Sequence, residues 1–269
     1  MTTTSTDRTA AADRTTTTTA GRMGALARAE LTLLVRSRAT LVTAVLVPLM
    51  LPLTVRSAFA EDDLADAGLS VGLVMLPAAI GFSLLFAVYA ALTSSYVVRR
   101  EELVLKRLRT GELRDREILV GAALPASGIG LAQCVLLTVG CTVFLDLGAP
   151  TEPHLAVLGV LLGLVLCVAL AAVTSAVTRT AESAQVTSLP MLFASMLGSG
   201  VAVPLEMLPD RAASVCELLP FTPVITLVRG AWTGDLSAYE ALGALATGLA
   251  WTAVAVFAVG RWFRWEPRR

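Results

Sequence analysis

Long uncharged runs of apolar residues constrain the fold of this chain more than any other feature. About 20 residues at a rise of 1.5 Å each cross the hydrocarbon core of a bilayer. Only 16% of the 269 residues are charged, and they cluster between the apolar runs. The pattern predicts an all-α integral membrane protein with six transmembrane helices, over about residues 39–58, 70–98, 118–145, 155–178, 183–205 and 240–260.

The composition excludes several classes of protein. Hydrophobic residues make up 55% of the chain, and 20 glycines raise the apolar share further, against roughly 45–50% in soluble domains. The 21 basic residues balance the 21 acidic ones, so no net charge attracts a polyanion. We therefore exclude a soluble enzyme, a disordered chain and a nucleic-acid binder. The four cysteines are isolated and there is one histidine, so we expect no zinc site.

The charges also predict the orientation of the chain. With the N-terminus inside, 18 of the 21 basic residues fall in cytoplasmic segments, as the positive-inside rule requires. Both termini are then cytoplasmic, with tails at residues 1–21 and 266–269, the first threonine-rich and disordered. The apolar piece Leu218–Val228 has only 11 residues and contains Pro220 and Pro223, which indicates a re-entrant or interfacial segment before the last helix.

Residues 22–38 form an amphipathic pattern immediately before the first predicted span. Apolar residues share one arc and arginines occupy the other, which is typical of a helix lying in the membrane interface. Glu30 falls inside the apolar arc. Two interpretations stay open: a plain juxtamembrane anchor, or an elbow helix that also contacts a partner through Glu30.

The segment Arg99–Glu117 carries seven basic and five acidic residues between two long spans. Helix-favouring residues predict a helix over 99–109, with Glu102 and Lys106 as an i,i+4 ion pair. Leu105 and Leu108 form a narrow apolar stripe on it. The segment is either a solvated loop that sets the topology or a docking element for a cytosolic partner.

Three stretches of the chain carry recognisable motifs. Arg100–Gly111 reads R-E-E-L-V-L-K-R-L-R-T-G. Ser199–Gly200 is followed by Pro204, Met207 and Pro209, and Pro220-Phe221-Thr222-Pro223 is followed by Arg229. In this order, the motifs resemble the first cytoplasmic loop, the signature that ends the fifth helix and the approach to the last helix in type-2 ABC exporter permeases of the multidrug and antibiotic type. The resemblance covers a permease domain over about residues 22–265.

The resemblance implies a transporter subunit of a bacterial plasma membrane, not an enzyme. It would pair with a second copy or a sister permease, and with a cytosolic ABC ATPase that binds ATP and magnesium; the chain lacks a phosphate-loop motif, and we expect no cofactor in it. The implied ATPase-coupling residues are Glu30, Arg100, Glu101, Glu102, Leu105, Lys106, Leu108 and Arg109. The candidate external gate comprises Ser199, Gly200, Pro204, Glu206 and Pro209.

Two other functions are compatible with this pattern. An ATPase-linked membrane module for signalling or envelope remodelling has the same sequence features. An intramembrane enzyme is disfavoured, because no predicted span has a central ionisable residue. An exporter with an apolar path suggests a hydrophobic drug-like or lipidic substrate.

We also expect Gly159 and Gly163 to pack helices closely within the chain, and the Thr93 hydroxyl to hydrogen-bond to a backbone carbonyl of its own helix.

Overall fold

The computed structural model describes residues 70–105, 115–144, 147–201 and 209–263, and this part of the chain is helical, without strands. The predicted elbow helix (22–38) and first span (39–58) lie outside the described residues. The helices are α4 (Val71–Ser83), η1 (Leu84–Ala90), α5 (Ala91–Glu101), α7 (Asp115–Phe144), α8 (Pro153–Val177), α9 (Ala181–Gly198), α10 (Asp210–Glu217), α11 (Thr222–Thr233) and α12 (Ala238–Trp262).

Among the described residues, four helices are long and apolar enough to cross a membrane, or up to five with one bent pair. Their bounds agree with the second, third, fourth and sixth predicted spans. The fifth predicted span (183–205) differs, because α9 stops at Gly198 and is not among these helices. Its first half carries Glu182, Gln185 and several hydroxyl residues, which lower its hydropathy. The four helices are Val71–Glu101, Glu117–Val143, Pro153–Val177 and Ala238–Trp262.

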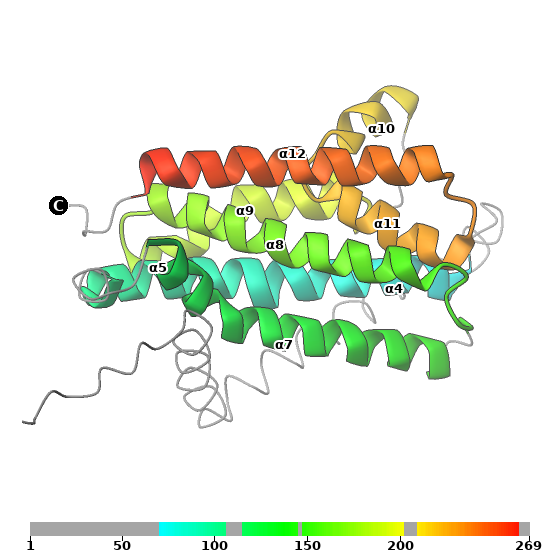
Figure 1. Cartoon of the computed structure of the whole chain (residues 1–269), viewed down its shortest axis with the longest axis horizontal. Coiled ribbons are helices and arrows are strands. Elements are labelled where there is room, and N and C mark those ends of the chain that lie inside the picture. Colours follow the sequence, from blue (N-terminus) through cyan, green and yellow to red (C-terminus); the bar gives the residue numbers. More distant parts are fainter. Residues whose placement is uncertain (1–69, 106–114, 145–146, 202–208, 264–269) are drawn as a thin grey trace, which may run out of the picture.

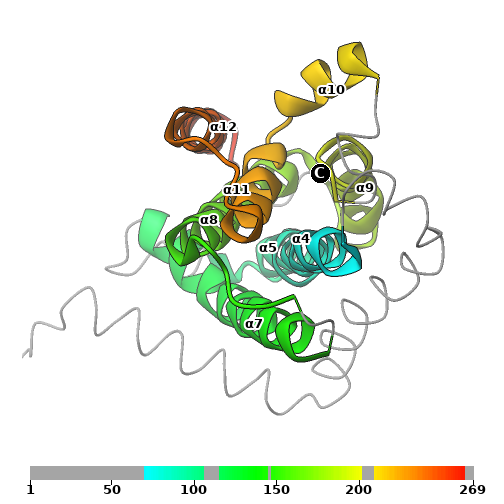
Figure 2. The same cartoon turned by 90° about the vertical axis from the view of Figure 1, so that its right-hand side faces the viewer.

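The rod formed by α4, η1 and α5 occupies the centre of the bundle (Figure 2). It packs against α7, α8, α9 and α11. In the most apolar 18-residue segment of the rod, 78% is buried inside the bundle. By contrast, α12 lies on the outside of the bundle against α8 and α11, and only 17% of its most apolar 18-residue segment is buried. The long helices run nearly parallel to the long axis, whereas the short α10 projects from the bundle at an angle (Figure 1). We call the two ends of the bundle the Arg100 end, where α5 and α8 finish, and the Trp232 end, where α4 and α8 begin.

The short apolar segment before the last helix forms a sharp corner. α10 and α11 are bent by 100° relative to each other, the geometry of a broken span or re-entrant loop. Pro223 lies in the first turn of α11, where its missing N–H removes no helical bond. Hydrogen bonds hold the corner: Thr222 Oγ1 donates to the Cys216 carbonyl at 2.6 Å, and Trp251 Nε1 donates to the Leu218 carbonyl at 2.9 Å. The corner is compatible with the predicted re-entrant segment and equally with a broken span.

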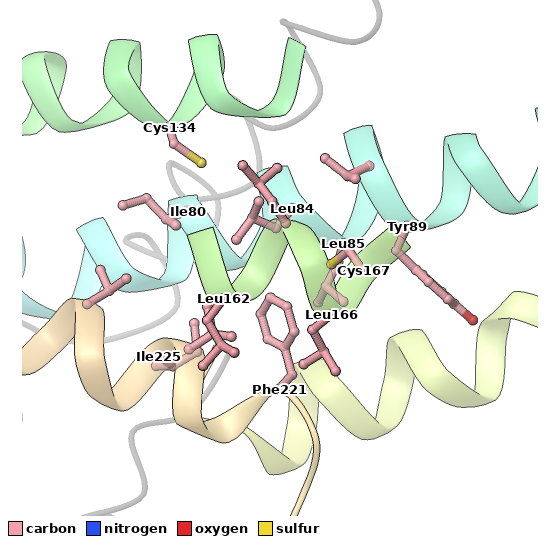
Figure 3. Close-up of a cluster of buried hydrophobic side chains, with 14 of the residues drawn as sticks. Ile80, Leu84, Leu85, Tyr89, Cys134, Leu162, Leu166, Cys167, Phe221 and Ile225 are labelled. Carbon is pink, nitrogen blue, oxygen red and sulfur yellow. The ribbon is translucent and has the colours of Figure 1, made fainter. Parts of the chain in front are cut away.

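The core joins side chains from the central rod with those of its neighbours (Figure 3). Leu84 and Tyr89 of the rod lie beside Leu166 of α8 and Phe221 at the start of α11. In a membrane, lipid tails are as apolar as leucine, so close packing and polar contacts hold helices together. Gly159 and Gly163 of α8 meet α11 within the chain: a Cβ added at either would lie 2.9–3.0 Å from a valine methyl group of α11. The prediction for this glycine pair is confirmed.

Two neighbouring glycines of α7, one facing the central rod and one not, offer a test of the packing between α7 and the rod. A Cβ at Gly130 would overlap Cγ2 of Val88 in η1, whereas nothing lies within 4 Å of a Cβ at Gly128. Val88 has a stiff β-branched side chain, so we expect Gly130→Ala to destabilise the fold by about 1–3 kcal/mol. We expect Gly128→Ala to stabilise it by up to about 1 kcal/mol through helix propensity. Unfolding midpoints in detergent should therefore shift in opposite directions; shifts of the same sign would contradict the packing.

Candidate functional site

Buried hydrogen bonds tie the central rod to its neighbours along its length. Ser83 Oγ donates to Gln133 Oε1 of α7 at 2.7 Å. The hydroxyl groups of Tyr89 and Thr174 of α8 share a hydrogen bond at 3.0 Å. Tyr96 donates to the α7 backbone carbonyl of Leu119 at 2.8 Å. Sequence reasoning missed these residues, although single polar side chains inside long apolar runs were the signal.

The rod contains a π-helical stretch, Leu84–Ala90, at its middle. π-Helical turns are rare and occur frequently at functional sites. Thr93 Oγ1 donates back to the Tyr89 carbonyl at 2.8 Å, just after this stretch. The predicted back-bonding of Thr93 is confirmed, so this hydroxyl is used within its own helix.

Arg100 is the largest buried polar side chain among the described residues, with 1% of its surface exposed. Nη1 donates to the Ser175 carbonyl at 2.8 Å, and Nη2 donates to the carbonyls of Thr178 at 2.6 Å and Arg179 at 3.3 Å. These carbonyls lie at the C-terminal end of α8, where the last backbone acceptors lack helical partners and the helix dipole is negative. A guanidinium, with a planar fork of donors, suits several acceptors at once.

Glu101, the next residue, contacts the helix that follows. Its Oε1 accepts a hydrogen bond from the Ala181 amide at 3.1 Å, in the first turn of α9, where unpaired N–H groups and a positive dipole end favour an anion. Thr180 caps the same helix through a reciprocal bond with Ser183. We call Arg100 on the α8 carbonyls and Glu101 on the Ala181 amide the Arg100–Glu101 clamp. Opposite charges on adjacent residues thus match the opposite helix ends at the α8–α9 turn.

The helix predicted over 99–109 is interrupted immediately after the clamp. α5 ends at Glu101, and Leu103 has a φ of 59°, a left-handed conformation that costs a non-glycine residue roughly 1–2 kcal/mol. Its amide donates to the Arg100 carbonyl at 3.1 Å. The turn lets Leu105 return to the bundle, where its side chain is fully buried. The part of 99–109 that the structure describes is therefore not one continuous helix.

The structure separates the predicted coupling residues into two groups. Arg100 and Leu105 are buried inside the chain, so neither presents its side chain to a partner in this conformation. Glu101 and Glu102 are exposed at the Arg100 end. Leu103, which sequence reasoning did not single out, is an exposed leucine beside them, 39% accessible. Outside the described residues lie Glu30, Lys106, Leu108 and Arg109.

The structure describes three of the five predicted external gate residues. Ser199 and Gly200 are buried after α9, and Gly200 has a φ of 76°. They follow Gly198, where an added Cβ would overlap Leu219 of the α10–α11 corner. Pro209 is exposed at the start of α10. The structure thus brings the end of α9 against the corner that precedes α11, while Pro204 and Glu206 lie outside the described residues.

A bundle of long apolar helices, tied by buried polar contacts and capped at one end by a charged clamp, defines a multi-pass membrane protein. The family model described as ABC-2 type transporter matches residues 22–232, so the chain belongs to this family of transporter permease modules. No curated protein sequence matches the chain.

Proposed function

We propose that this chain is the membrane-spanning subunit of an ATP-driven exporter, in which the Arg100–Glu101 clamp couples a cytosolic ATPase to the transmembrane helices. The observation that carries the proposal is the double contact at the α8–α9 turn. Arg100 and Glu101, at the end of α5 where the charged loop begins, are hydrogen-bonded to the end of α8 and to the start of α9, respectively. A force applied to that loop therefore moves three helices, α5, α8 and α9, together instead of one.

The charge distribution supports contact with the cytosol at the Arg100 end. The basic residues Arg99, Arg100, Arg179 and Arg261 lie at the Arg100 end, whereas α10 and α11 carry Arg211 and Arg229. Acidic residues lie at both ends, Glu101, Glu102 and Glu182 at the Arg100 end and Glu152, Asp235 and Glu240 at the Trp232 end. The positive-inside rule counts the basic residues, and acidic residues contribute little to it, so the excess of arginine supports a cytosolic Arg100 end.

The family supports a half-transporter arrangement. Two copies of this chain, or this chain and a sister permease, enclose the path, and two cytosolic ABC ATPase subunits bind ATP and magnesium. Closure of the ATPase pair pulls the loop after α5, and the clamp carries the movement into α8 and α9, switching the path between inward- and outward-open states. The apolar spans favour a hydrophobic drug-like or lipidic substrate.

Leu103 provides the sharpest test of the ATPase contact. Leu103→Asp places a charge at an exposed apolar position, and burying it unpaired against a partner is costly. Aspartate tolerates the left-handed conformation better than leucine, so the variant keeps its fold. We expect roughly tenfold less co-purification of the cytosolic ABC ATPase, a loss of about 1.4 kcal/mol in affinity, and a matching loss of ATP-driven export.

Leu218→Asp, at a leucine in the α10–α11 corner that is 68% exposed against 39% for Leu103, is the control for an added surface charge and should retain the ATPase. The chain purified alone should hydrolyse no ATP. Normal ATPase capture and export by Leu103→Asp, with an unchanged unfolding midpoint, would contradict docking at this loop. ATP turnover by the isolated chain would contradict the half-transporter arrangement itself.

A further inference from the structure

An apolar groove of about 290 Å³ lies between α7 and α8 towards the Trp232 end. Its walls are two helical stripes, with residues at i, i+4 and i+8 on α7 and at i and i+4 on α8. Ile80 of the central rod also lines it. The wall residues used below are Leu131, Val135, Val139, Val157 and Leu161, each between 42% and 58% exposed.

The groove offers no spare hydrogen-bonding side chain among the described residues that line it. Its hydroxyl group, that of Thr138, donates to the Cys134 carbonyl at 2.8 Å. Its indole, that of Trp232, donates to the Gly148 carbonyl at 3.3 Å. A ligand with polar groups would lose its bonds to water here without replacement. The lining therefore selects a hydrocarbon.

The shape of the groove also matches a hydrocarbon chain. Leu131 to Val139 spans eight residues, about 12 Å at 1.5 Å per residue. A volume of about 290 Å³ over that length corresponds to a channel about 5–6 Å wide, and saturated carbons pack at about 4 Å from one another. One extended chain fits lengthwise between the two helices.

The position of the groove identifies where that chain comes from. Its walls lie inside the spans Glu117–Val143 and Pro153–Val177, at the depth of the bilayer hydrocarbon. Pro150 and Trp232 border it at one end, and tryptophan is typical of the level of lipid headgroups. The exposed residues on both walls show that the groove opens on the outer surface of the described bundle.

We propose that this groove is a binding site for one acyl chain of a phospholipid in the leaflet at the Trp232 end, with the headgroup near Pro150. The lipid chain fills the space between α7 and α8, where direct side-chain packing is incomplete. The proposal does not depend on ATP coupling or on the identity of an exported substrate.

The test uses the full chain in phosphatidylcholine nanodiscs that contain a fraction of phosphatidylcholine with a diazirine in its acyl chain. After photolysis, labelling is mapped by mass spectrometry. We expect residues 131–139 and 156–161 to be labelled roughly tenfold more than the exposed leucines of α12, Leu242 and Leu249. This ratio corresponds to a difference of about 1.4 kcal/mol in the free energy of lipid binding. Equal labelling of both faces would mean that only annular lipid is present and would overturn the proposal.

Variants that fill the groove distinguish a bound chain from general exposure. Ala156 lines the groove, so Ala156→Phe should remove most of the labelling of its walls, whereas Ala253→Phe on exposed α12 should not. Val139→Phe, at the exposed rim, is a second filling variant if Ala156→Phe fails to fold. Unchanged wall labelling in a folded filling variant would overturn the site. A disulfide between two copies of Val135→Cys, with weak lipid labelling, would show that a second copy covers the groove instead.

Discussion

Replacing Arg100 with methionine is expected to destabilise the protein and, if the chain acts as proposed above, to abolish ATP-driven export. The three carbonyls of Ser175, Thr178 and Arg179 lose their charged donor, and methionine fills much of the space of the arginine stem without donating. Hydrogen bonds to charged groups contribute about 1.5–3 kcal/mol each, and they are not additive when one side chain makes all of them. We expect a net loss on the order of 3–5 kcal/mol, comparable with breaking a buried ion pair.

The measurement is the unfolding midpoint in detergent together with export by the reconstituted complex. Arg261→Met, which removes an exposed arginine at the same end of the bundle, is the matched control and should change the midpoint little. Arg100→Lys should rescue only part of the stability, because an ammonium is a point charge without the planar fork. If Arg100→Met and Arg261→Met unfold at the same midpoint, Arg100 does not hold the α8–α9 turn.

Replacing Gly163 with leucine is expected to prevent α11 from docking in the bundle. A Cβ at this position lies 2.7 Å from Leu84 Cδ1 and 2.9 Å from Val224 Cγ1, so the rest of the leucine side chain has no space between α8, η1 and α11. Overpacking of a filled core costs about 1–3 kcal/mol and occasionally more; with close contacts on two sides, we expect a cost of about 3 kcal/mol or more.

Proteolysis and size-exclusion chromatography measure the outcome: the variant should aggregate, or the α10–α11 corner should become a site of rapid cleavage. Gly140→Leu on α7 is the control, since nothing lies within 4 Å of a Cβ there. A monodisperse and protease-resistant Gly163→Leu variant would show that α8 and α11 are not in close contact.

The spans that the structure describes were largely predictable from local sequence. Hydrocarbon thickness sets the length of a span, so an uncharged run marks a helix wherever it packs. That is why the predicted span 70–98 and the observed Val71–Glu101 agree closely. The fifth span was harder, because α9 mixes apolar and hydroxyl residues and ends at Gly198, before the predicted boundary.

The candidate site was only partly predictable. The sequence located the polar loop that follows the second predicted span and identified Arg100 and Glu101 within it. It predicted one exposed helix for Arg99–Arg109, because helix propensity and i,i+4 charge spacing are local properties. A left-handed Leu103 is locally unfavourable, so no local signal predicts the turn there.

By itself, the sequence determined the fold class, the positions of the long spans, and the small residues that allow close contact between helices. Only the tertiary structure decided which helix those residues meet and which charges are buried. The Arg100 side chain reaches carbonyls 75 to 79 residues further along the chain, and the end of α8 can accept it only once α5 and α8 are packed together. The physical reason is that span formation depends on the transfer of a local segment into hydrocarbon, whereas burial of a charge depends on acceptors that a distant segment supplies.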